Sequence, residues 1–440
     1  MRFGTDGLRG RYPGEMSEDV ARRAGAAAAS VFAGTTILVG RDTRESGPGL
    51  VRAFIEGVTS SGGRCTDLGV APTPAVAWLA RLHSCAGAVV TASHNPWKDN
   101  GVKIFAPGGT KLTDGQQDAV QQLLDEARPP ADATAEPGFV ADDGSSMLHS
   151  WAEHVVATAG RGSLDGLTIV VDCGNGALSG VAPRVVAELG ATVVAVNAEP
   201  DGRNINDGCG AAHPSRLGGL VRMHRADLGI SFDGDGDRVI AADHEGTIVD
   251  GDRVIALAAA DLLGRGELDP RTVVVTVMSN AGFHDAMEAL GIAVVTVPVG
   301  DRNVLAAMER TGAELGGEQS GHVVFGRYAT TGDGLLTGAL LAGIVRRSGT
   351  TLRDLAAGAM HALPQVLVNA KAAAPRVAEE MAGEIAAAEA RLGGTGRILV
   401  RASGTEPVVR VMVEAATEGI ADAVARDLVA AVERRYAADR

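Results

Sequence analysis

The sequence predicts an α/β protein: three similar mixed α/β domains with mostly parallel sheets, followed by a smaller C-terminal α+β domain. Short apolar runs alternate with helical patterns between residues 35 and 93, which is typical of βαβ units. The same alternation starts again twice further along the chain. The last segment breaks this pattern, because "GRILVRASGTEPVVRVMVEA" indicates two strands around a glycine turn and "GIADAVARDLVAAVERRY" indicates an amphipathic helix.

Each of the three occurrences of this alternation, here called a pass, consists of successive strand and helix patterns. The first pass consists of "TTILVGRD", "GLVRAFIEGVTSSGG", "RCTDLGV", "TPAVAWLARLH" and "AGAVVTAS". The second runs from "LTIVVDCGNGA" to "DLGISFDGDGDR", and the third from "TVVVTVMSN" to "AELGGEQSGH". The stretch "DEARPPADATAEPGFVADDGSS" indicates a surface boundary after the first pass. We therefore expect four domains, at residues 1–150, 151–249, 250–364 and 365–440.

Each of the three passes ends in a loop rich in glycine and polar residues. Ligands of open α/β sheets gather at the carboxyl ends of the strands. The loops that carry Ser93, residues 233–237 and residues 318–322 are therefore expected to line one shared site.

Composition limits the class of partner. The formal charge of -14 and the absence of a basic tail argue against binding to nucleic acid or to an anionic membrane. The chain shows no signal-peptide pattern and no apolar segment long enough to span a bilayer, so we expect a cytoplasmic protein. We expect a monomer or a homodimer.

The four cysteines show no metal-ligand or C-x-x-C spacing, which predicts reduced and mostly buried thiols. The basic residues are nearly all arginine, and the lysines are only Lys98, Lys103, Lys111 and Lys371. Three of these follow "ASHNP" closely. Since a buried lysine can lose its proton and an arginine cannot, a chemical role for a lysine here is one interpretation and a solvated charged loop is the other.

The motif "DGDGDR" places Asp233, Asp235 and Asp237 after an apolar strand, with glycines that allow tight bends. Three carboxylates aimed at one point repel unless a cation lies among them, and oxygen ligands favour Mg²⁺. An EF-hand does not fit, because Arg238 and His244 occupy its glycine and glutamate positions. A solvated acidic turn remains the alternative.

Two other motifs suggest recognition of a sugar phosphate. "RASGTEPVVR" combines hydroxyl groups and backbone N–H groups with two arginines, which suits a phosphate clamp, although a plain polar hairpin would look similar. "GGEQSGH" offers side chains that can bond to vicinal hydroxyl groups, and "FGTDGLRG" places Arg9 on a glycine-framed turn.

Ser93 ends an apolar run in the stretch "ASHNP". It lacks a G-x-S-x-G elbow, and the adjacent His94 is poorly placed to act as its base, so acyl transfer is not expected. Beside an acidic metal loop and an arginine clamp, a serine that carries a phosphoryl group is the better hypothesis.

Taken in order, the motifs resemble those of the α-D-phosphohexomutase superfamily, most closely its bacterial phosphoglucosamine mutase branch. The shared motifs are "FGTDGLRG", "TASHNPWKDNGVKIF", "VVDCGNGA", "PDGRNINDGCGAAHP", "DGDGDR", "VDGD", "GGEQSGH", "TGDGLLT" and "RASGTEP". The resemblance implies a four-domain enzyme that interconverts glucosamine 6-phosphate and glucosamine 1-phosphate. It also implies Mg²⁺ as cofactor and a hexose 1,6-bisphosphate as intermediate and activator.

The resemblance also implies roles for individual residues. Ser93 matches the phosphoserine, which with Asp233, Asp235 and Asp237 would hold the metal ion. Lys103 matches a general base, Arg238 a residue that helps hold the phosphoserine, and Arg9 and His94 match active-site positions. The sugar-binding loop would include Glu318, Ser320 and His322. The phosphate that is not transferred would bind Arg401, Ser403, Gly404, Thr405 and Arg410.

Alternative functions remain open at this point. One alternative is a phosphoglucomutase or phosphomannomutase. Another is a biosynthetic paralogue that acts on a different hexose phosphate, since Ala402, Trp97-Lys98 and Asn303 depart from residues usual in the glucosamine branch. A sugar-phosphate phosphatase would use the same phosphoserine with water as acceptor. The complete set of motifs disfavours a catalytically inactive protein that only binds sugar phosphates.

Overall fold

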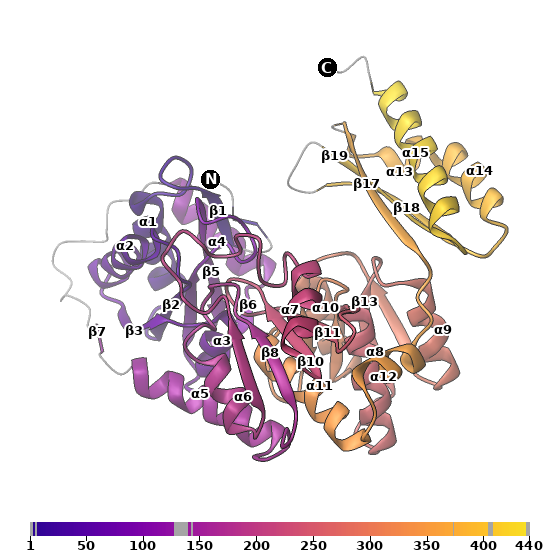
Figure 1. Cartoon of the computed structure of the whole chain (residues 1–440). Helices are drawn as coiled ribbons and strands as arrows, with labels where there is room; N and C mark the ends of the chain where they lie inside the picture. Colours follow the sequence, from indigo (N-terminus) through magenta and orange to yellow (C-terminus); the bar gives the residue numbers. More distant parts are fainter. Residues whose placement is uncertain are drawn as a thin grey trace. The chain divides into compact units, whose positions relative to one another are not determined.

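A computed structural model of the chain describes residues 3–4, 7–126, 140–141, 144–372, 374–403 and 408–436 (Figure 1). The chain divides into two units, each with its own packing. Unit 1 comprises Met1–Met278 and Ile292–Ala359, and unit 2 comprises Ser279–Gly291 and Met360–Arg440.

The first sheet of unit 1 has seven strands in the order β1-β5-β4-β2-β3-β7, with β6 paired to β5. The strands β2, β3, β4 and β7 run parallel, while β1, β5 and β6 pair antiparallel. Their bounds are β1 (Leu8–Arg11), β2 (Thr36–Arg41), β3 (Arg64–Val70), β4 (Ala86–Val90), β5 (Asp99–Ala106), β6 (Thr110–Lys111) and β7 (Val140–Ala141).

Helices cover both faces of this sheet. Alternate strand residues point to opposite faces, so Ile37 and Val39 join one apolar core while Leu38 joins another. The helices are α1 (Glu18–Val31), α2 (Gly47–Ser60), α3 (Thr73–Leu82) and α4 (Asp114–Asp125). A parallel sheet buried on both sides explains why its strands are continuous apolar runs in the sequence.

Helices α1 and α2 approach each other closely through two glycines. A Cβ atom at Gly25 would lie 2.0 Å from the carbonyl oxygen of Phe54, and one at Gly57 would lie 1.9 Å from that of Arg22. No larger residue fits between these backbones, so the two glycines set the distance between the helices.

The second sheet has the order β12-β11-β10-β8-β9. Strands β8, β9 and β10 run parallel, and the chain then turns back through β11 and β12. The elements of this region are α5 (Gly144–Ala159), β8 (Thr168–Asp172), α6 (Ala182–Glu188), β9 (Thr192–Val196), α7 (Ser215–His224), β10 (Leu228–Phe232), β11 (Val239–Asp243) and β12 (Ile248–Val249).

The third sheet has the order β14-β13-β15-β16, again parallel except for its last strand. Its elements in unit 1 are α8 (Gly251–Gly264), β13 (Thr272–Thr276), β14 (Ala293–Val297), α10 (Asp301–Thr311), β15 (Leu315–Gly317), β16 (Val323–Phe325), α11 (Gly334–Ser348) and α12 (Leu352–Ala359). Asp250 and Asp333 cap the N-termini of α8 and α11 with their side chains.

Unit 2 contains a three-stranded antiparallel sheet in the order β17-β19-β18. Its apolar core lies between one face of the sheet and helices packed on it. The elements are α9 (Ala281–Ala289), β17 (Gln365–Lys371), α13 (Val377–Glu380), α14 (Ala382–Leu392), β18 (Arg397–Ala402), β19 (Val408–Glu414) and α15 (Glu418–Arg435). Glu414 Oε2 accepts a hydrogen bond from Ala281 N at 2.9 Å, which ties α9 to this unit.

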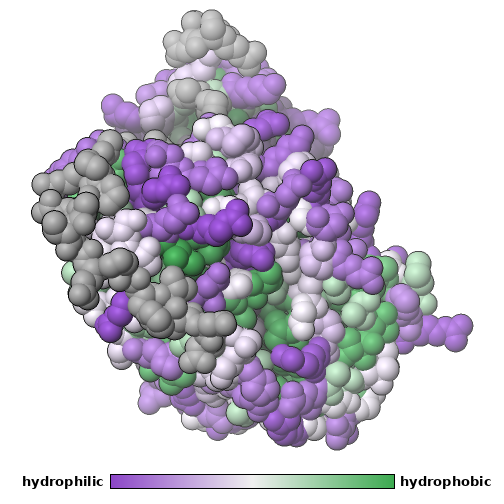
Figure 2. All heavy atoms as spheres, turned by 90° about the vertical axis from the view of Figure 1, so that its left-hand side faces the viewer, coloured by the Kyte–Doolittle hydropathy of each residue, from purple (hydrophilic) through white to green (hydrophobic). Residues whose placement is uncertain are grey.

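The predicted fold class is confirmed: three α/β sheets with parallel strands precede a smaller α+β unit. The two C-terminal strands and the last helix were expected, whereas β17 was not. The four cysteines are free and buried, as predicted. Within the described part of the chain, no helix combines the length and apolar character that a membrane span requires. Figure 2 shows one face of the molecule, on which hydrophilic residues predominate.

We predict that Gly57→Ala destabilises unit 1, although alanine is the better helix former. The added Cβ would clash with the Arg22 backbone, and overpacking of this kind costs roughly 1–3 kcal/mol. Gly358→Ala in α12 is the matched control, since a Cβ there meets open space. Calorimetry should show a lower unfolding midpoint for Gly57→Ala alone; equal midpoints would contradict the packing described.

Candidate active site

Ser93 lies in a buried loop directly after β4. Its backbone adopts a left-handed conformation (φ +53°), and only 1% of the residue is exposed. The Ser93 N–H donates to Thr91 Oγ1 at 2.9 Å, and the Ser93 hydroxyl donates to Asp233 Oδ2 at 2.7 Å. The loop therefore directs the hydroxyl toward the acidic loop of the second sheet.

Arg44 holds this loop in place from within the first domain. The side chain is fully buried and pairs with Asp42, with 2.8 Å between Nε and Oδ2. Its Nη2 donates to the carbonyl oxygens of Ser93 and Asn95, both at 2.8 Å, and its Nη1 donates to those of Pro96 and Asp99. One guanidinium thus bonds to four carbonyl groups between Ser93 and Asp99, the first residue of β5.

A loop of the second domain supports the same segment. Asn206 Nδ2 donates to the carbonyl oxygens of Ser93 at 2.9 Å and Asn95 at 3.2 Å. Arg203 pairs with Glu45 through two hydrogen bonds and lies 5.4 Å from the ring centre of Trp97. The Ser93 loop is therefore held by two domains.

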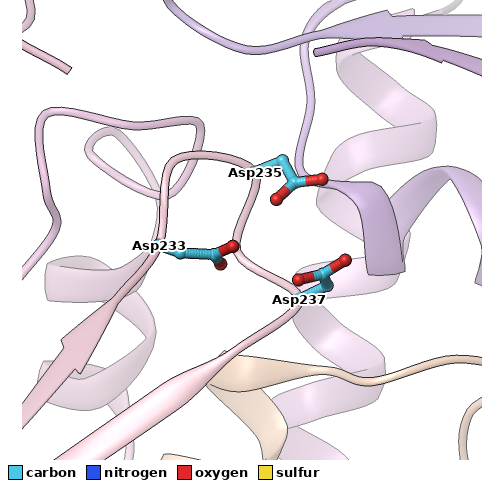
Figure 3. A group of neighbouring side chains, drawn as sticks. All are labelled: Asp233, Asp235 and Asp237. Atoms are coloured by element: carbon cyan, nitrogen blue, oxygen red, sulfur yellow. The ribbon is translucent and has the colours of Figure 1, made fainter. Parts of the chain in front are cut away.

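The three aspartates of "DGDGDR" lie on the tight loop between β10 and β11. One carboxylate oxygen from each lies within 4.8 Å of the other two, and all three residues are buried (Figure 3). Gly236 has a φ of +74°, which lets the loop turn back so sharply. The predicted convergence is therefore present.

The electrostatics of the three carboxylates differ. Burial and the charges of Asp237 and Asp235 raise the pKa of Asp233 well above its usual value. Burial also raises the pKa of Asp235, but the Lys103 ammonium, the Thr73 hydrogen bond and the charge of Arg9 together outweigh it, so this pKa falls below its usual range. The pKa of Asp237 is likewise lowered, because Lys103, His322 and Arg238 together outweigh burial and the charge of Asp235.

Lys103 is a buried cation in contact with two of these carboxylates. It is 3% exposed, and its Nζ lies 2.6 Å from Asp235 Oδ2 and 2.9 Å from Asp237 Oδ2. Strand β5 carries it, so the first domain supplies a positive charge to the acidic loop of the second. Thr73 adds a hydroxyl hydrogen bond to Asp235 Oδ2 at 2.6 Å.

The acidic loop fits a hard divalent cation. Asp235 Oδ1 and Asp237 Oδ1 are buried oxygens without a hydrogen-bond partner in the described part of the chain. Lys103 pairs with Asp235 and Asp237 but not with Asp233, and the donors are oxygen atoms only, which suits Mg²⁺. These residues can therefore hold a metal ion.

His94 and Arg238 lie beside the same group. His94 Nδ1 is 3.4 Å from Ser93 Oγ. Burial and the charges of Arg238 and Arg9 lower the pKa of His94 to about 4, so this imidazole is neutral at pH 7. The backbone N–H of Arg238 donates to Asp233 Oδ1 at 3.1 Å. Arg9 lies on β1, opposite Gly101 of β5.

The loop after β15 meets the acidic loop at a glycine. The Val239 N–H donates to the carbonyl oxygen of Gly321 at 3.0 Å, and a Cβ at Gly321 would lie 2.2 Å from the Val239 oxygen. Glu318 is buried and accepts a hydrogen bond from Gly300 N at 3.0 Å, whereas Ser320 is exposed.

His322 is buried behind this loop. Its Nε2 accepts a hydrogen bond from Gly332 N at 3.1 Å and lies 4.0 Å from Asp301 Oδ2. Lys111 Nζ is 2.7 Å from the same carboxylate oxygen. His322 is thus packed within the protein, while Glu318 and Ser320 form the loop itself.

The phosphate clamp expected in unit 2 is described in part. Arg401 of β18 and Arg410 of β19 are directly opposite each other in register, so their side chains share one face of the sheet. The Ser403 N–H donates to the carbonyl oxygen of Val408 at 2.8 Å. Gly404 and Thr405 lie outside the described residues.

The sequence interpretation missed the residues that position the site. Arg44, Asp42 and Asn206 belong to no recognised chemical motif. The only signal was the stretch "PDGRNINDGCG", which was noted for its resemblance and not for a contact with the Ser93 loop.

The chain matches four successive domain families of phosphoglucomutase/phosphomannomutase. The α/β/α domains I, II and III match residues 1–130, 149–246 and 250–363, and the C-terminal domain matches residues 363–431. The chain belongs to the phosphoglucomutase/phosphomannomutase family. It is therefore a phosphohexomutase by family, as the motifs suggested.

Relatives of this phosphohexomutase are similar over nearly their full length. Proteins described as phosphoglucosamine mutase from Nocardia farcinica and Frankia casuarinae are each 48% identical. The first match covers 97% of this chain and 98% of the relative, and the second covers 98% and 97%.

Solved structures of the family have the same fold. A phosphoglucomutase/phosphomannomutase family protein from Burkholderia thailandensis matches with a TM-score of 0.79 and 26% identity, over 97% of this chain and 95% of that one. An Aspergillus fumigatus N-acetylphosphoglucosamine mutase, solved with GlcNAc-6P and magnesium, matches with a TM-score of 0.71 and 20% identity, over 99% and 95%.

We predict that Arg44→Met destabilises the phosphohexomutase by about 3–5 kcal/mol, because it leaves the Asp42 carboxylate buried and unpaired. Amide hydrogens of residues 93–99 should exchange faster, since the carbonyl groups of this segment lose their common donor. Arg22→Met is the control: it breaks an exposed arginine–carboxylate pair in the same domain and should change little. Equal losses in the two variants would contradict a positioning role for Arg44.

Proposed function

We propose that the protein is a phosphoglucosamine mutase that interconverts glucosamine 6-phosphate and glucosamine 1-phosphate. The observation that carries the reaction type is the buried Ser93 hydroxyl, hydrogen-bonded to one carboxylate of a convergent acidic group. The choice of sugar rests on relatives named phosphoglucosamine mutase that are 46–48% identical over at least 97% of the chain.

In the proposed reaction Ser93 carries a phosphoryl group. The bond between phosphorus and the Ser93 oxygen breaks while the free sugar hydroxyl forms a new bond to phosphorus, which gives a 1,6-bisphosphate. The bisphosphate then reorients, and its other phosphoryl group returns to Ser93. The product is the isomeric monophosphate, and no water or nucleotide is consumed.

Lys103 is the proposed base for the sugar hydroxyl. Asp235 and Asp237 favour its charged form, and the same carboxylates are proposed metal ligands. Lys103 therefore releases its proton more readily when these carboxylates are neutralised by another cation. When bound by Asp233, Asp235, Asp237 and the Ser93 phosphate, Mg²⁺ would supply positive charge beside the transferring group.

The remaining residues have proposed binding roles. Arg238 and Arg9 would offset phosphate charge, and neutral His94 would donate or accept a hydrogen bond near Ser93. The loop of Glu318, Ser320 and His322 would form hydrogen bonds to the sugar hydroxyl groups. The phosphate that is not transferred would bind Arg401, Ser403, Gly404, Thr405 and Arg410.

The burial of Ser93 favours a mutase over the phosphatase alternative. With 1% of the residue exposed, bulk water has little access to a phosphoryl group on its oxygen. Transfer to a bound sugar is then favoured over hydrolysis. The same argument applies to a phosphoglucomutase or a phosphomannomutase, which would differ only in the sugar.

A substrate panel tests the proposal. With Mg²⁺ and a trace of hexose 1,6-bisphosphate, turnover of glucosamine 6-phosphate should exceed that of glucose, mannose and N-acetylglucosamine phosphates. Ser93→Ala should abolish isomerisation, and mass spectrometry should find phosphate on Ser93 of the native protein. Preference for another sugar would overturn the sugar assignment, and phosphate release faster than isomerisation would support the phosphatase.

We predict that Asp233→Asn abolishes metal binding without lowering the stability of the metal-free protein. Burial and neighbouring charges disfavour the Asp233 carboxylate, so its neutral replacement should leave the metal-free unfolding midpoint unchanged or raise it. The rise in midpoint that Mg²⁺ gives the native protein should be lost, together with isomerisation.

Asp118→Asn, on helix α4 of the first domain, is the control and should keep the full response to Mg²⁺. An undiminished Mg²⁺ response in Asp233→Asn would contradict the ligand role.

A further inference from the structure

A cavity of about 830 Å³ lies in unit 1, away from the acidic loop. Its walls come from the segment before β8, the turn between α7 and β10, the end of β11 and the end of α11. The polar side chains in these walls include Asp165, Arg222, Arg225, Asp227, His244 and Arg346. The size falls within the range of cavities that bind small molecules, roughly 300–1,000 Å³.

Two of the arginines are oriented by backbone carbonyl groups. Arg222 Nη1 donates to Glu245 O at 2.8 Å, and Arg346 Nε donates to Asp165 O at 2.6 Å. Each of these guanidinium groups bonds to the protein at one end and keeps further N–H donors. A guanidinium that is held at one edge and open at the other suits the oxygen atoms of a phosphate group.

The side chains of Arg225 and His244 make no hydrogen bond or ion pair with the residues that the structure describes, and both residues line the cavity. Arg225 ends α7 in a left-handed conformation (φ +50°), so its position is set by the turn. The carboxylate of Asp227 already accepts a hydrogen bond from Thr168 N at 2.7 Å. Three arginines thus face two carboxylates, Asp165 and Asp227, which leaves an excess of positive charge.

We propose that this cavity is a second binding site, for the phosphate group of a small phosphorylated molecule, with Arg225 and Arg346 as its main ligands. Arg222 and His244 complete the set of donors. The site is separate from the proposed mutase chemistry and does not depend on it.

The separation from the acidic loop follows from the strands. β10 begins beside Asp227 in the cavity and ends before Asp233, while β11 begins after Arg238 and ends before His244. Each strand has five residues, or about 17 Å. A ligand in the cavity therefore contacts the far ends of the two strands that carry the acidic loop.

Hydrogen exchange with mass spectrometry can test the site, because it locates binding along the chain. The probes are inorganic phosphate and glucosamine 6-phosphate, each titrated against the full-length protein. We expect protection of residues 222–228 and 346–351 in the native protein. In the double variant Arg225→Asn/Arg346→Gln, the concentration required for this protection should rise at least about tenfold.

The variants keep the experiment decisive. Asparagine tolerates the left-handed backbone at residue 225, so the variant should fold. Native exchange rates of residues 93–103 and 233–238 without ligand serve as the check that the double variant has folded. Arg310→Gln removes an exposed arginine of α10 outside the cavity and should behave like the native protein.

Each outcome has a defined meaning. If both probes protect the cavity, the site recognises the phosphate group itself. If only glucosamine 6-phosphate protects it, the site requires a phosphate ester. Protection confined to the acidic-loop segments in the native protein would overturn the proposal. So would cavity protection that is equally strong in the double variant.

Discussion

The arrangement of unit 1 depends on the burial of three carboxylates around one lysine. Such a group is unfavourable within a single domain, since like charges at this distance repel and burial removes the water that would screen them. Lys103 and Thr73 from the first domain bond to aspartates of the second, and Gly321 of the third domain accepts a hydrogen bond from Val239, next to the acidic loop. The electrostatic cost is offset only when the domains are assembled, so the charges also specify how the domains meet.

Backbone carbonyl groups are the second constraint. The segment between β4 and β5 has no regular structure, its residues 91–93 are buried, and its carbonyl oxygens need donors. Arg44 and Asn206 provide them from two domains. The segment that carries Ser93 is therefore held by side-chain donors, in place of the ladder of a sheet or the bonds of a helix.

The sequence was informative where a residue type has few alternatives. Aspartates alternating with glycines after an apolar strand predicted the convergent loop, and repeated βαβ patterns predicted the three sheets. The rarity of lysine drew attention to the three lysines after "ASHNP", and the family resemblance then pointed to Lys103 among them. Domain boundaries and residue roles that depend on long-range contacts could not be predicted from the sequence. Arg44 is one of many arginines in the sequence, and only the fold shows that it bonds to four carbonyl groups. Strand β17 was missed because its exposed positions, such as Leu367 and Asn369, mix apolar with polar residues and blur the alternation.

The left-handed backbone of Ser93 bears on which hydroxyl amino acid can occupy this position. A β-branched side chain is strongly disfavoured at a positive φ, whereas a short unbranched one is tolerated. Threonine carries the same hydroxyl but would strain the loop that Arg44 and Asn206 hold rigid. The identity of the residue is thus constrained twice, by the chemistry of its oxygen and by the handedness of its backbone.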